Sequence, residues 1–135
     1  MNTAIGEEAL EANESGDWNT AIGSQALEAN ESGDGNTAIG SEALQANTAS
    51  YNTAIGSWAL EANTSGSGNT AIGSEALKVN TASYNTAIGS EVLKANLSGT
   101  RNIAIGYAAY DTADAENDNL AIGYNALGGA VNGAE

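Results

Sequence analysis

The segment Asn36-Thr37-Ala38-Ile39-Gly40 decides the fold, because close copies of it open eight consecutive units of the chain. The copies begin at Asn2, Asn19, Asn36, Asn52, Asn69 and Asn85, and return as Asn-Ile-Ala-Ile-Gly at Asn102 and Asn-Leu-Ala-Ile-Gly at Asn119. Successive copies lie 16 or 17 residues apart. Such short and nearly constant spacing is typical of a solenoid, in which each unit packs against its neighbours along the chain.

The composition excludes an ordinary globular core. The 135 residues include 27 Ala but only 21 Leu, Ile and Val together, no Phe, and a net charge of −14. A globular domain needs more large apolar residues than this, whereas a stacked rung buries its apolar side against the next rung. We therefore expect one all-β domain, a parallel β-solenoid of about eight rungs over residues 1–127, with a flexible end at residues 128–135.

Stacking turns each position of the unit into a column. The isoleucine column is Ile5, Ile22, Ile39, Ile55, Ile72, Ile88, Ile105 and Ile122. The glycine column that follows it is Gly6, Gly23, Gly40, Gly56, Gly73, Gly89, Gly106 and Gly123. A leucine column runs from Leu10 to Leu127 and is interrupted by Tyr110. Glycine at the end of a short strand predicts a sharp corner that requires a positive φ.

The Thr-Ala-Ile stretch is β-prone, and its alternation places Thr and Ile on one face and Ala on the other. Ile103 and Leu120 replace Thr in the last two units, which predicts that the Thr and Ile columns face a packed surface. The alanine column, from Ala4 to Ala121, forms a flat opposite face suited to contact with another chain. The sequence leaves open which face is the solenoid core and which is an interface.

The second half of the unit, such as Ser41 to Asn47, is rich in helix-forming residues and begins with a favourable N-cap. Helices on every rung would splay the stack, since strands are spaced by about 4.8 Å and helix axes by 8–10 Å. We therefore favour a second short strand or an irregular turn. The alternative is an intertwined trimeric solenoid, in which the rungs of three chains alternate and each repeat has room for a short helix.

Several function classes are excluded by what the sequence lacks. The chain has no Cys and no His, which removes thiol nucleophiles, imidazole bases and the usual zinc ligands. Its only basic residues, Lys78, Lys94 and Arg101, cannot offset the charge of nucleic acid. Met1 leads directly into the repeat, and no apolar run is long enough to span a bilayer. We expect a protein that is not an enzyme, holds no cofactor, and binds neither nucleic acid nor membrane.

Two groups of acidic residues are candidates for a functional site, either a cation site or a catalytic pair. Asp111, Asp114, Glu116 and Asp118 form the densest patch, with oxygen ligands of the kind that Ca²⁺ prefers. The patch lacks the Gly and the distal Glu of an EF-hand loop, so a solvated loop is the favoured interpretation. One edge column holds carboxylates on four rungs: Glu11, Glu28, Glu61 and Asp111. Because like charges on neighbouring rungs repel, this column indicates a solvated edge and not a catalytic pair.

Three polar or aromatic columns have both a structural and a binding interpretation. Two Asn columns, from Asn2 and from Asn13, fit hydrogen-bonded ladders better than sugar-binding amides. The Thr column from Thr3 to Thr86 resembles the spaced hydroxyls of ice-binding solenoids. Trp18, Tyr51 and Tyr84 alternate with glycines, so their rings can cover the gaps or stack on sugars, as Trp58 can.

The element Asn36 to Ala43, Asn-Thr-Ala-Ile-Gly-x-x-Ala, resembles the head-domain repeats of trimeric autotransporter adhesins from Gram-negative bacteria. With Tyr107 and Tyr124 it also resembles the Asn-Thr-Ala-Ile-Gly-Tyr repeats of phage tail fibres. The resemblance covers practically the whole chain and implies a left-handed parallel β-roll that forms a homotrimer. It also implies an extracellular place on a bacterial surface or virion tail, and a host-surface protein or glycan as partner. An ice-binding solenoid is the alternative function.

Overall fold

The computed structural model describes residues 1–111 and 115–128, and in them the chain coils into an all-β solenoid of about seven turns. Its strands are short: β1 (Thr3–Ile5), β2 (Thr20–Ile22), β3 (Thr37–Ile39), β4 (Thr53–Ile55), β5 (Ala62–Asn63), β6 (Thr70–Ile72), β7 (Val79–Asn80), β8 (Thr86–Ile88), β9 (Ala95–Asn96), β10 (Ile103–Ile105) and β11 (Leu120–Ile122). Residues 129–135 of the expected flexible end lie outside the described residues.

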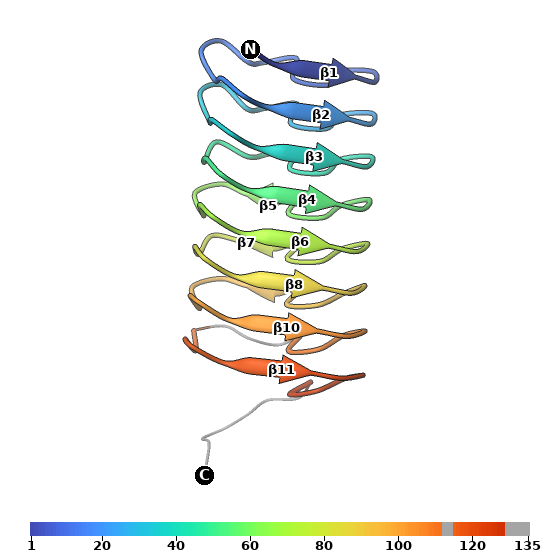
Figure 1. The fold of residues 1–135 in the computed structure, drawn as a ribbon, viewed down its shortest axis with the longest axis vertical. Coiled ribbons are helices and arrows are strands. Elements are labelled where there is room, and N and C mark those ends of the chain that lie inside the picture. The colour runs from blue at the N-terminus through green and yellow to red at the C-terminus, as the bar shows by residue number, and fades with distance from the viewer. Residues whose placement is uncertain (112–114, 129–135) are drawn as a thin grey trace.

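The larger sheet contains one strand from every repeat, in the order β1-β2-β3-β4-β6-β8-β10-β11 (Figure 1). All its pairs are parallel and in register, so that Thr pairs with Thr, Ala with Ala and Ile with Ile from β1 to β8. Ile103 and Leu120 continue the threonine column without a shift. The connecting turns therefore absorb the difference between 16- and 17-residue units, and the columns expected from the repeat are aligned.

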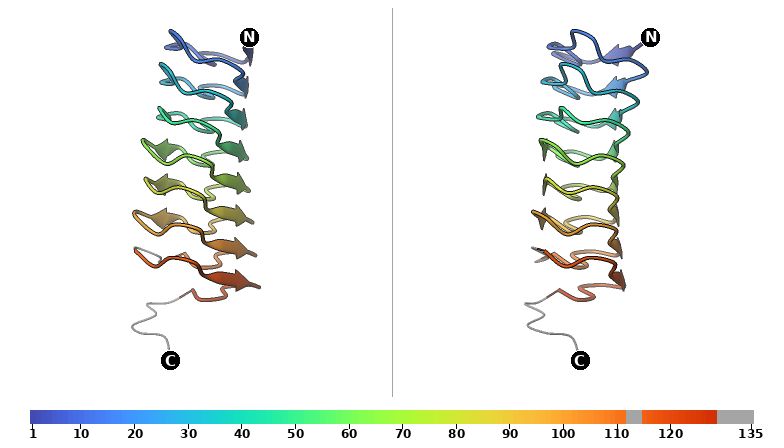
Figure 2. Two further views of the ribbon diagram at one scale, coloured as in Figure 1. Left: turned by 60° about the vertical axis from the view of Figure 1, so that its left-hand side comes forward. Right: turned by 90° about the vertical axis from the view of Figure 1, so that its left-hand side faces the viewer.

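A second parallel sheet, β5-β7-β9, lies on the opposite side of the stack (Figure 2). It is formed by the second half of the fourth, fifth and sixth repeats, where residues preceding the turn pair as Ala62 with Val79 and Val79 with Ala95. The corresponding segments of the other described rungs are turns. The preference for a short strand or an irregular turn is therefore confirmed, and the described residues contain no helix, in contrast to the intertwined alternative.

Helix-forming residues become turns here because the rung must bond to both of its neighbours. Within the third repeat the amide of Ala43 donates to the carbonyl of Gly40, and that of Gln45 to Glu42, so the bonds span three residues. Glu42 and Leu44 adopt left-handed conformations, with φ of 57° and 54°. This alternation lets the amide of Glu42 bond to one neighbouring rung and that of Leu44 to the other. Hydrogen bonds between rungs thus override local helix propensity.

The core is a thin layer between the two sides of the rung. The alanine column of the larger sheet and the leucine column of the turns fill it, and alanine and leucine are fully buried on the middle rungs. Tyr110 takes the place of leucine in the seventh repeat and is also buried. The expectation that the alanine column forms an exposed contact face is therefore wrong. The alanine methyl groups and the leucine side chains opposite belong to one buried cluster.

Two buried ladders of Asn side chains close each rung. The backbone amide of Asn36 donates to the side-chain Oδ1 of Asn19 at 2.8 Å, and Nδ2 of Asn19 donates to the carbonyl of Gly33 at 2.7 Å. In the second column, Nδ2 of Asn30 donates to the same carbonyl at 3.0 Å and to Oδ1 of Asn13 at 3.1 Å. Such pairing satisfies amides that would otherwise be buried at a high cost. The ladder interpretation of these columns is confirmed.

Candidate interaction surfaces

The strand face, defined as the outward side chains of the larger sheet, carries the longest column of exposed large apolar side chains among the described residues. On the middle rungs the threonines are half-buried, while Ile22, Ile39, Ile55 and Ile72 are each 37% exposed. Because register is strict, these side chains form two straight columns with a rise of about 4.8 Å per rung. We expected the Thr and Ile columns to face a packed surface, but they do not pack against the core of their own chain.

The strands that form this face contain no charged residue. The chain has 17 acidic and 3 basic residues, yet no strand of the larger sheet contains any of them. The acidic residues that the structure describes lie in the turns and connecting segments. Since a surface that approaches a second copy of a chain with net charge −14 must avoid repulsion, this is the region of the described residues best suited to self-association.

The glycine column holds the rungs close together at the edge of the strand face. Its members have φ between 132° and 141°, a region that side chains rarely adopt. A Cβ atom at Gly73 would lie 2.2 Å from the carbonyl oxygen of Gly89. Most rungs repeat this close approach, which confirms the sequence expectation of a corner that requires glycine.

A row of exposed aromatic side chains flanks the strand face one residue before the opening Asn. Trp18, Tyr51 and Tyr84 are 66–73% exposed and lie two rungs, or about 10 Å, apart. A Cβ atom at Gly35 would lie 2.9 Å from the Tyr51 ring, and Gly68 has the same relation to Tyr84. The two tyrosine rings therefore occupy the space above the alternate glycines, as the sequence predicted.

The strand face is more apolar on its last two rungs than on the others. Ile103 and Leu120 replace threonine on the strand face and are 43% and 64% exposed. Tyr107 and Tyr124, in the turn after the strand, stack with ring centroids 5.5 Å apart and an interplanar angle of 14°. The hydroxyl of Tyr107 also donates to Glu91 at 3.1 Å, and this bond raises the pKa of Tyr107 above its ordinary value.

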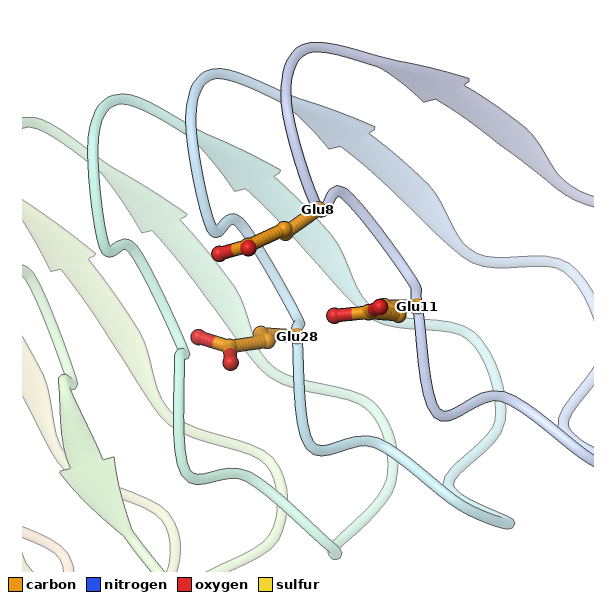
Figure 3. Close-up of side chains that lie close together, drawn as sticks. All are labelled: Glu8, Glu11 and Glu28. Carbon is orange, nitrogen blue, oxygen red and sulfur yellow. The ribbon is translucent and has the colours of Figure 1, made fainter.

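A cluster of three carboxylates lies at the acidic edge of the first two rungs, where Glu8, Glu11 and Glu28 have oxygens within 4.8 Å of one another (Figure 3). Glu8 accepts a hydrogen bond from Gln25, and Glu28 accepts one from Gln45, each at 2.7 Å. The column of Glu11 and Glu28 was expected from the sequence, but the approach of Glu8 was not. These carboxylates can hold a hard cation, but equally stand as a solvated acidic edge.

Further along the same edge, lysines convert the column into a ladder of ion pairs. Lys78 lies 3.3 Å from Glu61 and 5.3 Å from the centre of the Trp58 ring. Lys94 lies 2.7 Å from Glu75 and 3.4 Å from Glu91. The hydrogen bond from Lys94 holds the pKa of Glu75 below its usual value, and the same bond raises the pKa of Lys94.

The acidic patch of the seventh repeat does not gather into a comparable group. Asp118 makes a bidentate pair with Arg101, at 2.6 and 2.8 Å, which lowers the pKa of that carboxyl. Glu116 accepts a hydrogen bond from the amide of Ala115, and Asp114 lies outside the described residues. Among the residues described, Asp111, Glu116 and Asp118 are not close enough together to share an ion.

Comparison with known proteins adds no assignment: no family, curated protein or solved structure matches the chain. Within the described part of the chain, no helix has the length and apolar character required to cross a bilayer. A functional interpretation therefore depends on the surfaces themselves.

Proposed function

We propose that this chain is a non-enzymatic structural module that forms a homotrimer through its strand face, as a shaft or head of a bacterial surface adhesin or phage tail fibre. The observation that carries the proposal is the isoleucine column, which is aligned on every rung and remains exposed on most of them. Soluble proteins seldom leave so long an apolar strip facing water.

Burial of the strip is favourable and repeats along the stack. Covering the exposed third of an isoleucine contributes about 0.5–1 kcal/mol, from the value for burying a whole side chain. Every rung adds such a contribution for each chain, and the flat columns allow side chains of neighbouring chains to interdigitate. The absence of charge in the strands means that no ionic group has to be desolvated.

Three chains are favoured over two by the resemblance to trimeric adhesin heads, in which similar repeats form left-handed β-rolls packed side by side. Each strand presents a strip only two outward side chains wide, and three such strips can surround a common axis parallel to the stacks. The acidic turns would then lie away from that axis. The outer surface, including the row of Trp18, Tyr51 and Tyr84, would be available to a host-surface protein or glycan.

The oligomeric mass tests this proposal directly. Light scattering at micromolar concentration should give the mass of three chains, and Ile55→Glu should reduce it to one. Val79→Glu is the matched control, because Val79 is 39% exposed, close to the 37% of Ile55, but lies on the opposite sheet. A monomeric or dimeric mass for the unsubstituted chain would contradict the trimer, and dissociation by Val79→Glu alone would place the interface elsewhere.

Ice binding is the second candidate function, and the half-exposed threonine column favours it. From Thr20 to Thr86 five hydroxyl-bearing side chains stand in register on a flat sheet. Trimerisation buries the face that ice binding needs, so the two functions exclude each other. Thermal hysteresis of a monomeric chain, lost in Thr53→Tyr, would favour ice binding, whereas a trimer without hysteresis would exclude it.

A further inference from the structure

The strand face carries the same outward pair of side chains on its first six strands and a different pair on the last two. The outward residues are Thr and Ile from β1 to β8, Ile103 and Ile105 on β10, and Leu120 and Ile122 on β11. This difference becomes important in the trimer proposed above, on which the present inference rests.

Identical rungs specify the alignment of neighbouring chains weakly. If one chain of a trimer slips along the axis by one rung, five of its six Thr-Ile rungs still meet a Thr-Ile rung of the neighbouring chain. Besides the mismatch at the sixth, only one rung at each end is left without a partner. Repeating surfaces of this kind are prone to alternative registers unless some position differs from the rest.

The last two rungs supply that difference. In the correct register, three copies of Ile103 share one level and three copies of Leu120 share the next. A slip of one rung places the Thr86 hydroxyl of one chain level with Ile103 of another and leaves the Leu120 level incomplete. Leu120 is 64% exposed in the single chain, so it has much apolar surface that such an error would leave uncovered.

The adjoining turns make this end of the chain distinctive as well. Tyr107 and Tyr124 occupy the position that holds Ser in the five preceding repeats, and their stacked rings are tied to Glu91 through the Tyr107 hydroxyl. We propose that Ile103 and Leu120, flanked by these tyrosines, set the register in which the chains of the trimer align. The six identical rungs then extend the contact without having to specify it.

The test uses the absence of native cysteine to report register. Chains carrying Ile22→Cys are mixed with nitrogen-15-labelled chains carrying Ile39→Cys, then unfolded, refolded together and oxidised. Ile22 and Ile39 are on adjacent rungs, so aligned chains form disulfides only between equal positions. Slipped chains join the thiol introduced at position 22 of one chain to the thiol introduced at position 39 of another. Mass spectrometry distinguishes this mixed light–heavy dimer from the two uniform ones.

We expect almost no mixed dimer from the otherwise native chains and a several-fold increase when both chains also carry Ile103→Thr and Leu120→Thr. These substitutions restore residues found on the other six strands, so the rung itself should fold. Adding Thr70→Ile and Thr86→Leu moves the apolar pair to β6 and β8 and should suppress the mixed dimer again. Lost stability at the C-terminal end alone would not be rescued in this way.

Light scattering of the same samples separates the two proposals. A monomeric mass for the unsubstituted chain overturns the trimer itself. A trimeric mass with no increase in mixed dimer after substitution overturns the role of Ile103 and Leu120 in register. Conversion of the doubly substituted chain to monomers also overturns it, because the last two rungs would then hold the trimer together instead of aligning it.

Discussion

In each inner strand of the larger sheet, neighbouring alanine and isoleucine side chains have opposite environments. Ala71 is fully buried, whereas Ile72 is 37% exposed. The usual preference would bury the larger apolar side chain. In this solenoid the interior of the rung is already occupied by Leu77 from the turn side, which is fully buried in the same cluster as Ala71.

Two apolar columns of one strand therefore serve different purposes. The alanine column determines how close the strand lies to the leucine column, and so contributes to the stability of the single chain. The isoleucine column contributes little inside the chain and has its surface available to a partner. Substitutions in the fifth repeat can separate these roles, because a change in either column has an effect on stability that can be measured.

The largest effect is expected at the corner that keeps the rungs close. Gly73→Ala should lower the free energy of unfolding by about 4 kcal/mol or more, in the range of exceptional single substitutions, because its Cβ would lie 2.2 Å from the Gly89 carbonyl oxygen. Urea denaturation followed by circular dichroism measures it. Gly123→Ala is the control, since it has a similar φ but a Cβ position 3.8 Å from its nearest neighbour. Equal effects would show that backbone strain, and not the close approach, determines the loss.

The next effect compares the inner and outer apolar columns directly. Leu77→Ala should cost about 2–5 kcal/mol per chain, the usual range for a cavity left by a buried leucine. Ile72→Ala should cost about 0.5–1 kcal/mol in a dilute single chain, since part of its side chain already faces water. If the proposed trimer forms, this cost should increase with protein concentration. Denaturant melts over a range of protein concentrations measure both, and equal losses in dilute solution would contradict the assignment of inner and outer columns.

A smaller effect is expected in the Asn ladder that closes the rungs. Asn63→Ala should cost about 1–3 kcal/mol, because it leaves buried hydrogen-bonding groups without partners. Nδ2 of Asn63 donates to Gly66 at 2.7 Å and to Asn47 at 2.8 Å, and Oδ1 accepts from Asn80. Asn13→Ala, at the half-buried start of the column, is the control for thermal melts. A loss at Asn63 no greater than at Asn13 would indicate that water replaces the ladder.

The repeat itself made much of the fold predictable. Parallel stacking, strand register, the glycine corner and the Asn ladders each require the same residue at the same place on successive rungs, and the sequence displays that identity. The direction of the strand faces was not predictable in this way. An alternating Thr-Ala-Ile strand is compatible with either face inward, and the thickness of the core depends on how the turn presents Leu77.

The turn geometry also explains why the acidic cluster was only partly foreseen. Glu11 and Glu28 share a column, so their proximity follows from stacking. Glu8 belongs to a different column, and its approach depends on left-handed conformations at Glu8 and Leu10, with φ of 57° and 56°. Neither residue type favours that conformation. At Leu10 it accompanies a hydrogen bond from the amide to the carbonyl of Ala26 on the next rung. Local sequence preferences therefore contain little information about this part of the surface.

The smallest effect is expected at the ion-pair ladder of the acidic edge. Glu75→Gln should lower the stability only slightly at pH 7, as is usual for an ion pair at a protein surface. The pKa of Glu75 is lowered in the folded chain, so its contribution is present above the unfolded pKa and is lost as the pH falls through the folded value. Lys94 has a raised pKa, so its contribution is lost only as the pH rises through that value.

The difference in melting temperature between the native chain and Glu75→Gln should therefore vanish in acid. It should also shrink in strong salt, which screens exposed charges. Glu42→Gln is the matched control, because Glu42 occupies the same column with nearly the same φ, 57° against 59°, and has no ion pair among the described residues. Removing its charge from a strongly acidic chain should leave stability unchanged or slightly higher. A loss at Glu42 equal to that at Glu75 would mean that the edge is stabilised by something other than its lysines.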